Sequence, residues 1–283
     1  MESQLQSFVN SLKDKAEKAI TREEGDYEKD GILYCGKCHT SKQHRLVILG
    51  SEQTVPCLCK CADEKKEEER KILEAHKREE LIKELRREAF RDVSMHDWTF
   101  ENDDRSNARI SDIMRRYTAN FDKVRNEEIN GILLYGRTGT GKSYIAACVV
   151  NALVDRGIPA LMITFDNIRN RLQQSFEGRQ EYIDMLANYP FLVIDDLGAE
   201  SESDYMQEII FSVIDARALT GKPLVVTTNM TIDQLKNPST ERKARVHSRV
   251  IGMCHPVEVS GEDRRRRLRY MHESNLMKEI LGG

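Results

Sequence analysis

The 283-residue sequence has no uninterrupted apolar run that approaches the ~18–20 residues of a membrane-spanning helix. Its first residues, MESQLQSFVNSLKDK, lack the apolar core of a secretory signal peptide. An excess of one charge is also missing, because 44 Lys and Arg against 47 Asp and Glu leave a net charge of only −3. Any surface for nucleic acid must therefore be local. These absences exclude membrane, exported and collagen-like proteins and predict a cytoplasmic protein with no membrane partner.

Cysteine is scarce and unevenly placed. Of seven cysteines, five fall within one short N-terminal segment: Cys35, Cys38, Cys57, Cys59 and Cys61. In a reducing compartment such a cluster indicates a metal site rather than a disulfide framework. Cys148 and Cys254 stand alone in apolar or helical context, and we expect them to be thiols of the core.

The cluster offers ligands for one tetrahedral zinc ion. Cys35 and Cys38 have the two-residue spacing of a zinc knuckle, and a closed site of four thiolates is structural. The two other thiolates must come from Cys57, Cys59 and Cys61. Spacing leaves that choice open, with His39 and His44 as alternative ligands. An iron–sulfur cluster and a group of free thiols without metal are the competing interpretations.

Composition divides the chain into three parts. Residues 1–61 hold a polar lead-in and the cysteine cluster, and residues 62–96 form a linker. Most of that linker, residues 62–92, is rich in charges of both signs and has no Gly or Pro. This favours a solvated helical spacer with i,i+4 ion pairs over a coiled coil or partner-binding helix. Residues 97–283 form the largest part.

In this largest part, apolar runs alternate with helical patterns. Strands are expected at residues 129–135, 160–164, 191–194, 224–228 and 256–259, and helices at 142–155, 166–188 and 203–219. In the N-terminal part, a weak helix is expected over residues 1–30 and short strands over 31–34 and 46–49. Near-continuous apolar strands separated by helices indicate an α/β fold with a parallel sheet covered on both faces.

Residues 136–143, GRTGTGKS, match the phosphate-binding pattern G-x-x-x-x-G-K-[ST]. An apolar strand precedes them and a helix follows, so that backbone N–H groups and the helix N-terminus face the phosphates. Lys142 is expected to reach the β- and γ-phosphates of ATP, and Ser143 to ligate Mg²⁺. The residues expected to contact the nucleotide are Gly136, Arg137, Thr138, Gly139, Thr140, Gly141, Lys142, Ser143 and Tyr144.

A second acidic element follows in FLVIDDLGAE, where a buried strand is expected to end before Asp195 and Asp196. Ligands bind at the carboxyl ends of parallel strands. Asp195 fits a Mg²⁺ ligand and Asp196 a group that polarises the attacking water, with Glu200 as the rival for that second role. The alternative is that both aspartates cap the next helix.

Further candidates follow the acidic strand. Asn229 ends the apolar run LVVTTN and fits a sensor of the γ-phosphate, although it also fits a cap of the turn before Thr231. Arg242, Arg245 and Arg249 follow in a helical segment. Arginines four residues apart share one helix face. That face fits a solvated surface, a phosphate clamp within the chain, or a finger that enters a neighbouring subunit.

Two other groups of arginine are candidates for contacts with partners. Residues 263–270, DRRRRLRY, fit a DNA backbone contact, a nucleotide or intersubunit contact, or a solvated helix. On the helix expected over residues 203–219, the apolar side chains are expected in the core and Arg217 at an intersubunit site.

Taken together, YGRTGTGKS, VIDDLGAE, TTN and SRV resemble the DnaC/IstB group of AAA+ ATPases. The cysteine strings, the charged linker and WTFENDD are similar to phage or Firmicute helicase loaders of the DnaC/DnaI kind. The resemblance implies a five-stranded ASCE sheet with the sensor strand between the P-loop and acidic strands. It also implies that Arg249, or else Arg245, is an arginine finger, and that Arg264 or Arg265 contacts the nucleotide.

The function implied by this resemblance is ATP-dependent delivery of a hexameric replicative helicase onto single-stranded DNA. The zinc module would bind the helicase, and the AAA+ part would contact DNA and self-associate. Two departures from the family pattern stand out: Arg137 replaces a proline, and Asp196 replaces the more usual Glu. The shorter acid predicts slow hydrolysis, which fits a switch. The alternatives are an IstB-like transposition helper and a nucleotide-gated adaptor with negligible turnover.

Overall fold

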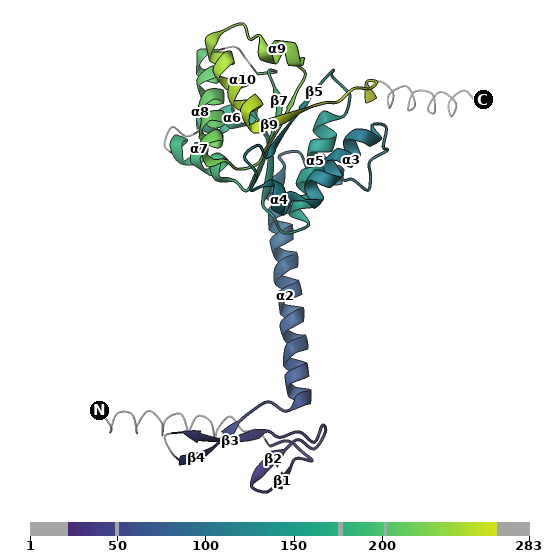
Figure 1. Cartoon of the computed structure of the whole chain (residues 1–283), viewed down its shortest axis with the longest axis vertical. Coiled ribbons are helices and arrows are strands. Elements are labelled where there is room, and N and C mark those ends of the chain that lie inside the picture. Colours follow the sequence, from purple (N-terminus) through teal and green to yellow (C-terminus); the bar gives the residue numbers. More distant parts are fainter. Residues whose placement is uncertain (1–21, 49–50, 175–177, 201–202, 265–283) are drawn as a thin grey trace, which may run out of the picture. The chain divides into compact units, whose positions relative to one another are not determined.

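The computed structural model describes residues 22–48, 51–174, 178–200 and 203–264 (Figure 1). The chain divides into two compact units, residues 1–78 and residues 79–283. Most of the predicted helical lead-in, and all of the arginine run after Arg264, lie outside the described residues. None of the helices in the described part of the chain combines the length and apolar character needed to cross a bilayer.

The smaller unit contains two antiparallel hairpins. In the first, β1 (Tyr27–Lys29) pairs with β2 (Ile32–Tyr34), and in the second β3 (Gln43–Ile48) pairs with β4 (Ser51–Pro56). The prediction of a helical lead-in that reaches residue 30 is therefore wrong at its end, because residues 27–29 form a strand. Strand β4 was not predicted, since its sequence SEQTVP has little apolar character.

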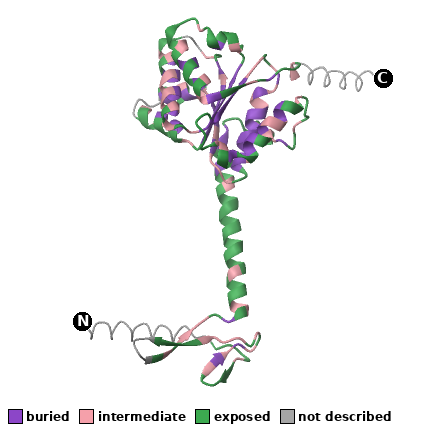
Figure 2. Cartoon of the chain, viewed as in Figure 1, coloured by how far each residue is buried: buried purple, intermediate pink, exposed green. Residues whose placement is uncertain are grey.

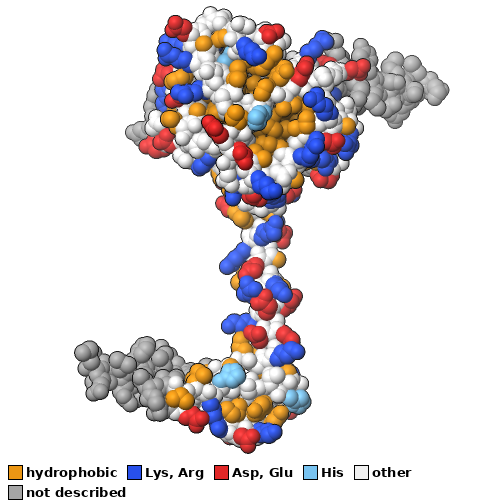
Figure 3. Space-filling view, viewed as in Figure 1, with side chains coloured by type: hydrophobic (Ala, Val, Ile, Leu, Met, Phe, Trp, Pro, Cys, Tyr) orange, Lys and Arg blue, Asp and Glu red, His pale blue; other side chains and the backbone are white. Residues whose placement is uncertain are grey.

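Helix α2 (Lys60–Ala89) follows the second hairpin. Its residues 68–81 are all exposed (Figure 2). Acidic and basic side chains lie next to one another along it (Figure 3), and Arg70 pairs at 2.7 Å with both Glu67 and Glu74. Such i,i+3 and i,i+4 pairs each add a few tenths of a kcal/mol to an isolated helix, ~0.2–0.5. The end of α2 differs, because Leu85 and Ala89 are buried in the core of the larger unit.

Five parallel strands form the centre of the larger unit. They are β5 (Gly131–Tyr135), β6 (Ala160–Thr164), β7 (Phe191–Leu197), β8 (Leu224–Thr228) and β9 (Cys254–Glu258). Their order is β6-β7-β8-β5-β9. This confirms the predicted α/β class and the place of β8 between the P-loop strand and the acidic strand. The carboxyl ends of β5, β7 and β8 therefore meet at one edge of the sheet.

Helices cover both faces of this sheet (Figure 1). One face packs against α3 (Ala108–Ala119) and α5 (Lys142–Val154), together with the end of α2. The other face packs against α6 (Phe165–Gln174), α7 (Arg179–Asn188), α8 (Asp204–Thr220) and α10 (Glu241–Met253). Shorter helical segments are η1 (Val93–Asp97), α4 (Phe121–Val124) and α9 (Ile232–Lys236).

The predictions for one helix and one strand need correction. The single helix expected over residues 166–188 is two helices, because Gly178 takes a left-handed backbone (φ 84°) directly before α7. The bounds of the last strand also shift, to Cys254–Glu258. Cys148 and Cys254 are buried, which confirms them as core thiols.

Arg217 is not at a surface, and its prediction as an intersubunit residue is wrong. Its side chain is fully buried on α8 and donates to the carbonyl oxygens of Leu186, Ala187, Tyr189 and Pro223. These bonds cap the end of α7 and hold the loop that leads into β8. Burial lowers the pKa of this guanidinium to about 10, so that it remains charged at neutral pH.

Candidate functional site

The P-loop connects β5 to α5 and depends on glycine at two places. A Cβ on Gly136 would lie 2.5 Å from the carbonyl oxygen of Val259, directly after β9, so only glycine fits there. Gly141 directly precedes α5 and has a left-handed backbone (φ 95°) that most side chains avoid. The loop thus turns directly from a buried strand into a helix N-terminus. That geometry presents backbone N–H groups to an anion.

Lys142 brings two of the predicted elements together. Its side chain is almost fully buried, and its Nζ donates to the carbonyl oxygens of Gly136 at 2.9 Å and Arg137 at 2.8 Å. The same Nζ donates to Oδ1 of Asn229 at 2.8 Å. The predicted sensor amide at the tip of β8 therefore contacts the predicted phosphate-binding lysine of the P-loop.

Asp195 and Asp196 differ in surroundings although they are neighbours. Asp195 is buried and accepts a hydrogen bond from the Thr227 hydroxyl at 2.6 Å and another from Ser143. Burial raises the pKa of its carboxyl, and these hydrogen bonds oppose that effect. Asp196 is half-buried, and its backbone N–H donates to the same Thr227 oxygen at 2.9 Å. Thr227 was missed by sequence reasoning, although a polar residue inside the apolar run LVVTTN was a usable signal.

The acidic strand does not end before Asp195, as predicted, but continues to Leu197 through an irregularity in its pairing with β8. At this point Asp196 has a left-handed backbone (φ 58°). The extra residue of such a β-bulge changes the direction of side chains, and bulges are frequent next to active sites. Asp196 lines a cavity, whereas Asp195 is buried near the carboxyl end of β7.

A cavity of about 440 Å³ lies at this edge of the sheet. Eight of its lining residues come from the predicted site: Thr138, Gly139, Gly141, Lys142, Ser143, Tyr144, Asp196 and Asn229. Arg264 lines it as well, and so do three residues from the segment before α3, which are Trp98, Asn102 and Asp104. The cavity is therefore closed by residues distant in sequence, and it is large enough for a nucleotide.

Aromatic and charged groups form one side of this cavity. The rings of Trp98 and Tyr144 lie 5.6 Å apart, and the Arg264 guanidinium lies 5.0 Å from the centre of the Tyr144 ring. Arg264 also pairs with Asp104 at 2.6 Å. A flat, partly apolar wall of this kind suits a purine base. Of the two arginines implied by the resemblance, Arg264 lines the cavity and Arg265 lies outside the described residues.

Three other candidates are not at the cavity of their own chain. Arg249 on α10 pairs with Asp215 on α8 at 2.8 Å, and about half of its side chain is exposed. Arg245 lines a separate surface groove on the same helix, together with Arg242. Glu200 lines a smaller pocket rather than the nucleotide cavity.

In the smaller unit, four thiols meet in one cluster. The Sγ atoms of Cys35, Cys38, Cys59 and Cys61 all lie within 4.8 Å of one another. Cys57 is not among them, and its thiol lies 3.4 Å from the carbonyl oxygen of Ser41. Neither His39 nor His44 belongs to the cluster.

The electrostatics of the cluster fit a bound cation. Hydrogen bonds, the largest from the Thr40 hydroxyl, lower the pKa of the Cys38 thiol to about 5. The neighbouring sulfur atoms, first of all that of Cys59, raise the pKa of Cys61 to about 12. Four thiolates cannot all carry charge at this distance without a positive ion between them. Four sulfur ligands are a donor set that Zn²⁺ accepts in structural sites.

The knuckle is held by a carboxylate that sequence reasoning missed. Asp26 accepts the backbone N–H of Gly36 at 3.0 Å and that of Glu23 at 2.9 Å, and it pairs with Lys42. These contacts lower the pKa of Asp26 to about 2, with the hydrogen bond from Lys42 as the largest cause. Because Gly36 lies between the first two ligands of the cluster, Asp26 fixes the turn that aims them.

The parallel sheet and the cavity at its edge define an ATP-binding P-loop domain of the AAA+ class. In this class the loop after the first strand binds phosphate, while the tips of two neighbouring strands face it. A family model described as IstB-like ATP binding protein matches residues 57–272, and the chain belongs to this family.

Named relatives are found among helicase loaders. The chain is 27% identical over 166 residues to the replicative helicase loader DnaI of Bacillus subtilis (strain 168), covering 54% of this chain and 53% of that protein. It is 30% identical over 132 residues to the replicative helicase loader DnaC of Escherichia coli (strain K12), covering 45% and 52%. The chain thus spans about half the length of these relatives. A crystal structure of DnaI shares the fold, with a TM-score of 0.52 at 24% identity over 62% of this chain and 95% of that one.

Proposed function

We propose that this chain is an ATP-dependent loader that delivers a hexameric replicative helicase onto single-stranded DNA. The observation that carries the proposal is the similarity to two replicative helicase loaders, over 166 and 132 residues. Membership of an ATP-binding family supports ATPase activity. Hydrolysis of ATP acts as a switch between two states of the loader. The protein acts in DNA replication in the cytoplasm.

In the proposed site, residues of the P-loop from Gly136 to Tyr144 bind ATP. Lys142 contacts the β- and γ-phosphates, and its hydrogen bond to Asn229 supports a sensor role for that amide. Ser143 and Asp195 hold Mg²⁺, whose charge offsets that of the phosphates when it is bound. Their mutual hydrogen bond places a hydroxyl and a carboxylate, both oxygen ligands of the type Mg²⁺ prefers, side by side. Asp196 faces the cavity and orients the attacking water.

The active form is an oligomer in which Arg249 reaches the site of the next subunit, with Arg245 as the alternative. Arg249 is partly exposed on α10 and does not line its own cavity, which supports action between chains. Its pairing with Asp215 gives the guanidinium a defined position before assembly. A guanidinium from a neighbour stabilises charge on the phosphoryl group in the transition state.

The smaller unit binds one zinc ion through Cys35, Cys38, Cys59 and Cys61 and contacts the helicase. The exposed apolar side chains Leu46 and Val47 on β3 support a role in protein binding. We keep the functional division into residues 1–61, 62–96 and 97–283: zinc module, linker and ATPase. The ATPase part contacts single-stranded DNA, for which the arginine run of residues 263–270 is the candidate.

Co-purification tests this proposal. The tagged full-length chain is mixed with the replicative DNA helicase of its own host, with ATP, and the complex is separated by size. We expect a stable complex that places helicase on circular single-stranded DNA only when both loader and ATP are present. Lys142→Ala is the matched variant that should fail to load. The proposal is wrong if the chain neither binds the helicase nor changes its association with DNA.

Two other functions remain as outcomes of the same experiments. The family description names IstB, so the first alternative is a transposition helper of the IstB kind, which coats DNA and chooses target sites. Filament formation on duplex DNA without helicase binding would favour it. A nucleotide-gated adaptor would bind ATP and helicase with no measurable turnover.

A further inference from the structure

A second, smaller pocket adjoins the ends of the two strands that face the nucleotide cavity. Its volume is about 100 Å³, and its lining includes Leu197 at the end of β7, Gly198 and Glu200 after β7, and Met230 after β8. The residues directly before these, Asp196 and Asn229, line the nucleotide cavity. At the end of each strand, therefore, one residue lines the nucleotide cavity and the next residue lines the smaller pocket.

The backbone between the two spaces is held by Glu200. Its Oε2 accepts the N–H of Gly198 at 2.8 Å. Gly198 has a left-handed backbone (φ 91°), and a Cβ at this position would lie 2.9 Å from Cε of Met230. The turn after Asp196 is thus fixed on one side by the Glu200 carboxylate and on the other by the Met230 side chain.

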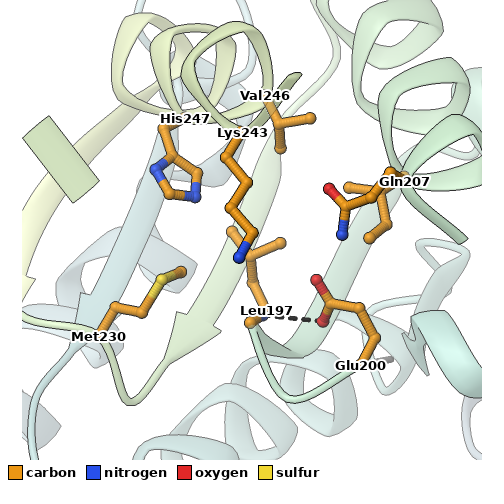
Figure 4. A pocket seen from close by; sticks show the side chains of 9 residues that line it. Leu197, Glu200, Gln207, Met230, Lys243, Val246 and His247 are labelled. Carbon is orange, nitrogen blue, oxygen red and sulfur yellow. Dashed lines mark hydrogen bonds between the residues drawn. The ribbon is translucent and has the colours of Figure 1, made fainter. Parts of the chain in front are cut away.

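The pocket also receives side chains from two helices. Figure 4 shows Gln207 of α8 pointing toward Glu200 and Lys243 of α10 reaching into the same pocket, with His247 of α10 on the side away from Glu200. Burial raises the pKa of the Glu200 carboxyl, and the positive charge of Lys243 opposes this effect. His247 is buried, with its Nδ1 3.1 Å from the carbonyl oxygen of Leu235. Glu200 therefore lies where the turn after β7 meets the helix that carries Arg249.

We propose that Glu200 is a positioning residue for ATP hydrolysis, and that it acts by accepting the Gly198 N–H. This bond fixes the turn after the bulge, and so the direction in which Asp196 enters the nucleotide cavity. Glu200 does not line the nucleotide cavity, so it does not itself activate the water. The inference rests on the proposed ATPase activity.

Three variants of the full-length protein test this role by steady-state ATPase measurements. Glu200→Ala removes the acceptor, and we expect kcat to fall by ~10–100-fold, because small misplacements of a catalytic group are costly, while KM changes by less than about twofold. Glu200→Gln keeps an oxygen that accepts the Gly198 N–H, and its kcat should stay within about threefold of the wild type. Glu208→Ala on α8 is the control and should behave as the wild type.

The conservative variant separates positioning from base catalysis. A general base must take up a proton, so an amide in its place would lose as much activity as alanine. Equal loss in Glu200→Gln and Glu200→Ala would therefore overturn the proposal. If Glu200→Ala does not fold, the comparison of Glu200→Gln with the wild type still decides the question.

Amide hydrogen exchange gives a readout that does not need turnover. We expect Glu200→Ala to speed exchange in the segment that contains Gly198, while Glu200→Gln and Glu208→Ala leave it within about threefold of the wild type. Unchanged exchange in Glu200→Ala would overturn the role of the hydrogen bond. Absence of turnover in the wild-type protein would instead refute the ATPase proposal, and the exchange measurement would still test the bond.

Discussion

The larger unit surrounds its cavity with strands that are buried on both faces, whereas the smaller unit surrounds its four thiols with hardly any core. Of the described residues in the smaller unit, only Leu33, Cys35 and Cys59 are buried, and two of these belong to the cluster itself. In the larger unit the site residues stand on a sheet that is folded by its own packing. The comparison indicates that the larger unit folds through its own packing without nucleotide, whereas the proposed zinc ion would itself hold the smaller unit together.

The largest effect should follow the loss of one cluster ligand. Cys35→Ser should release zinc and unfold residues 22–61, because structural zinc supplies ~10–16 kcal/mol in small zinc peptides, more than so small a core can replace. ATP binding by the larger unit should remain. Zinc content by elemental analysis and amide exchange of the smaller unit measure the change.

Cys57→Ser is the matched control for that experiment. Since Cys57 lies outside the cluster, this variant should keep one zinc per chain. Loss of zinc in Cys57→Ser, or purified protein that contains iron and sulfide, would contradict the assignment.

The next largest effect should be on ATP binding at the cavity, with little effect on folding. Lys142→Ala should weaken ATP binding by at least ~100-fold, since it removes the ammonium group that the loop places for the β- and γ-phosphates. The melting temperature of the larger unit should change by only a few degrees, and titration with a fluorescent ATP analogue measures the binding. Lys123→Ala, at an exposed position of α4, is the control. A Lys142→Ala protein that unfolded would remove the contrast between the two units.

The two aspartates should separate binding from turnover. Asp195→Asn should remove Mg²⁺-dependent hydrolysis, and Asp196→Asn should bind ATP but lose ~10²–10⁴ in turnover, as expected for a lost general base. Phosphate release and analogue binding are measured on the same preparations. Normal turnover in Asp196→Asn together with none in Glu200→Gln would show that Glu200 is the acid.

Complementation between inactive variants tests whether the cavity is completed by a neighbour. Arg249→Ala and Lys142→Ala are each inactive alone, but mixing them should restore part of the activity, because some interfaces pair an intact P-loop with an intact Arg249. Arginine fingers contribute ~10³–10⁵ in other phosphoryl-transfer enzymes, and a slow ATPase should show less. If both variants assemble and mixing restores nothing, Arg249 acts within its own chain or only supports the structure.

Replacement of the buried Arg217 should change only the stability of the larger unit. Arg217→Met removes the buried guanidinium that donates to four carbonyl oxygens, and we expect the free energy of unfolding of the larger unit to fall by about 3 kcal/mol or more. Urea unfolding measures it. Arg109→Met, at an exposed position of α3, should change it by less than about 0.5 kcal/mol.

The smallest effect should come from the support of the zinc knuckle. Asp26→Ala removes the acceptor for the Gly36 N–H but no ligand, and residues that orient metal ligands typically contribute ~10–100-fold in affinity. We expect zinc affinity, measured by competition with a chelator, to fall by ~10-fold. An unchanged affinity would show that the four thiolates alone fix the knuckle.

The periodic patterns of apolar residues along the chain were sufficient to predict most of the fold. Two strands, residues 160–164 and 224–228, have the predicted bounds, because both are short apolar runs that end in threonine. The P-loop pattern fixes local geometry, so its residues also lie where the pattern predicts. Strand β4 and the division of residues 166–188 were missed, since neither a polar edge strand nor a single glycine changes periodicity enough to be read.

Contacts between distant segments were the part of the site that sequence could not give. Trp98 and Asp104 reach the cavity from a segment some forty residues before the P-loop, and nothing in their own surroundings marks them as neighbours of Arg264. The choice between Cys57 and its neighbours also depends on three-dimensional direction. In a regular strand, residues two apart point to the same side, yet Cys57 contacts Ser41 while Cys59 joins the cluster, because β4 ends at Pro56 and α2 begins at Lys60.

The left-handed backbone at Asp196 restricts which acids the site can use. Among residues with a side chain, aspartate and asparagine accept such a backbone most readily, and longer or branched residues adopt it at a higher cost in free energy. The short acid that sets this chain apart from the family pattern is thus the one that its bulged strand accommodates. Faster hydrolysis could evolve through a glutamate at residue 196. Such a substitution would require a change in the backbone of the strand as well, so the substitution and the backbone change would have to be inherited together.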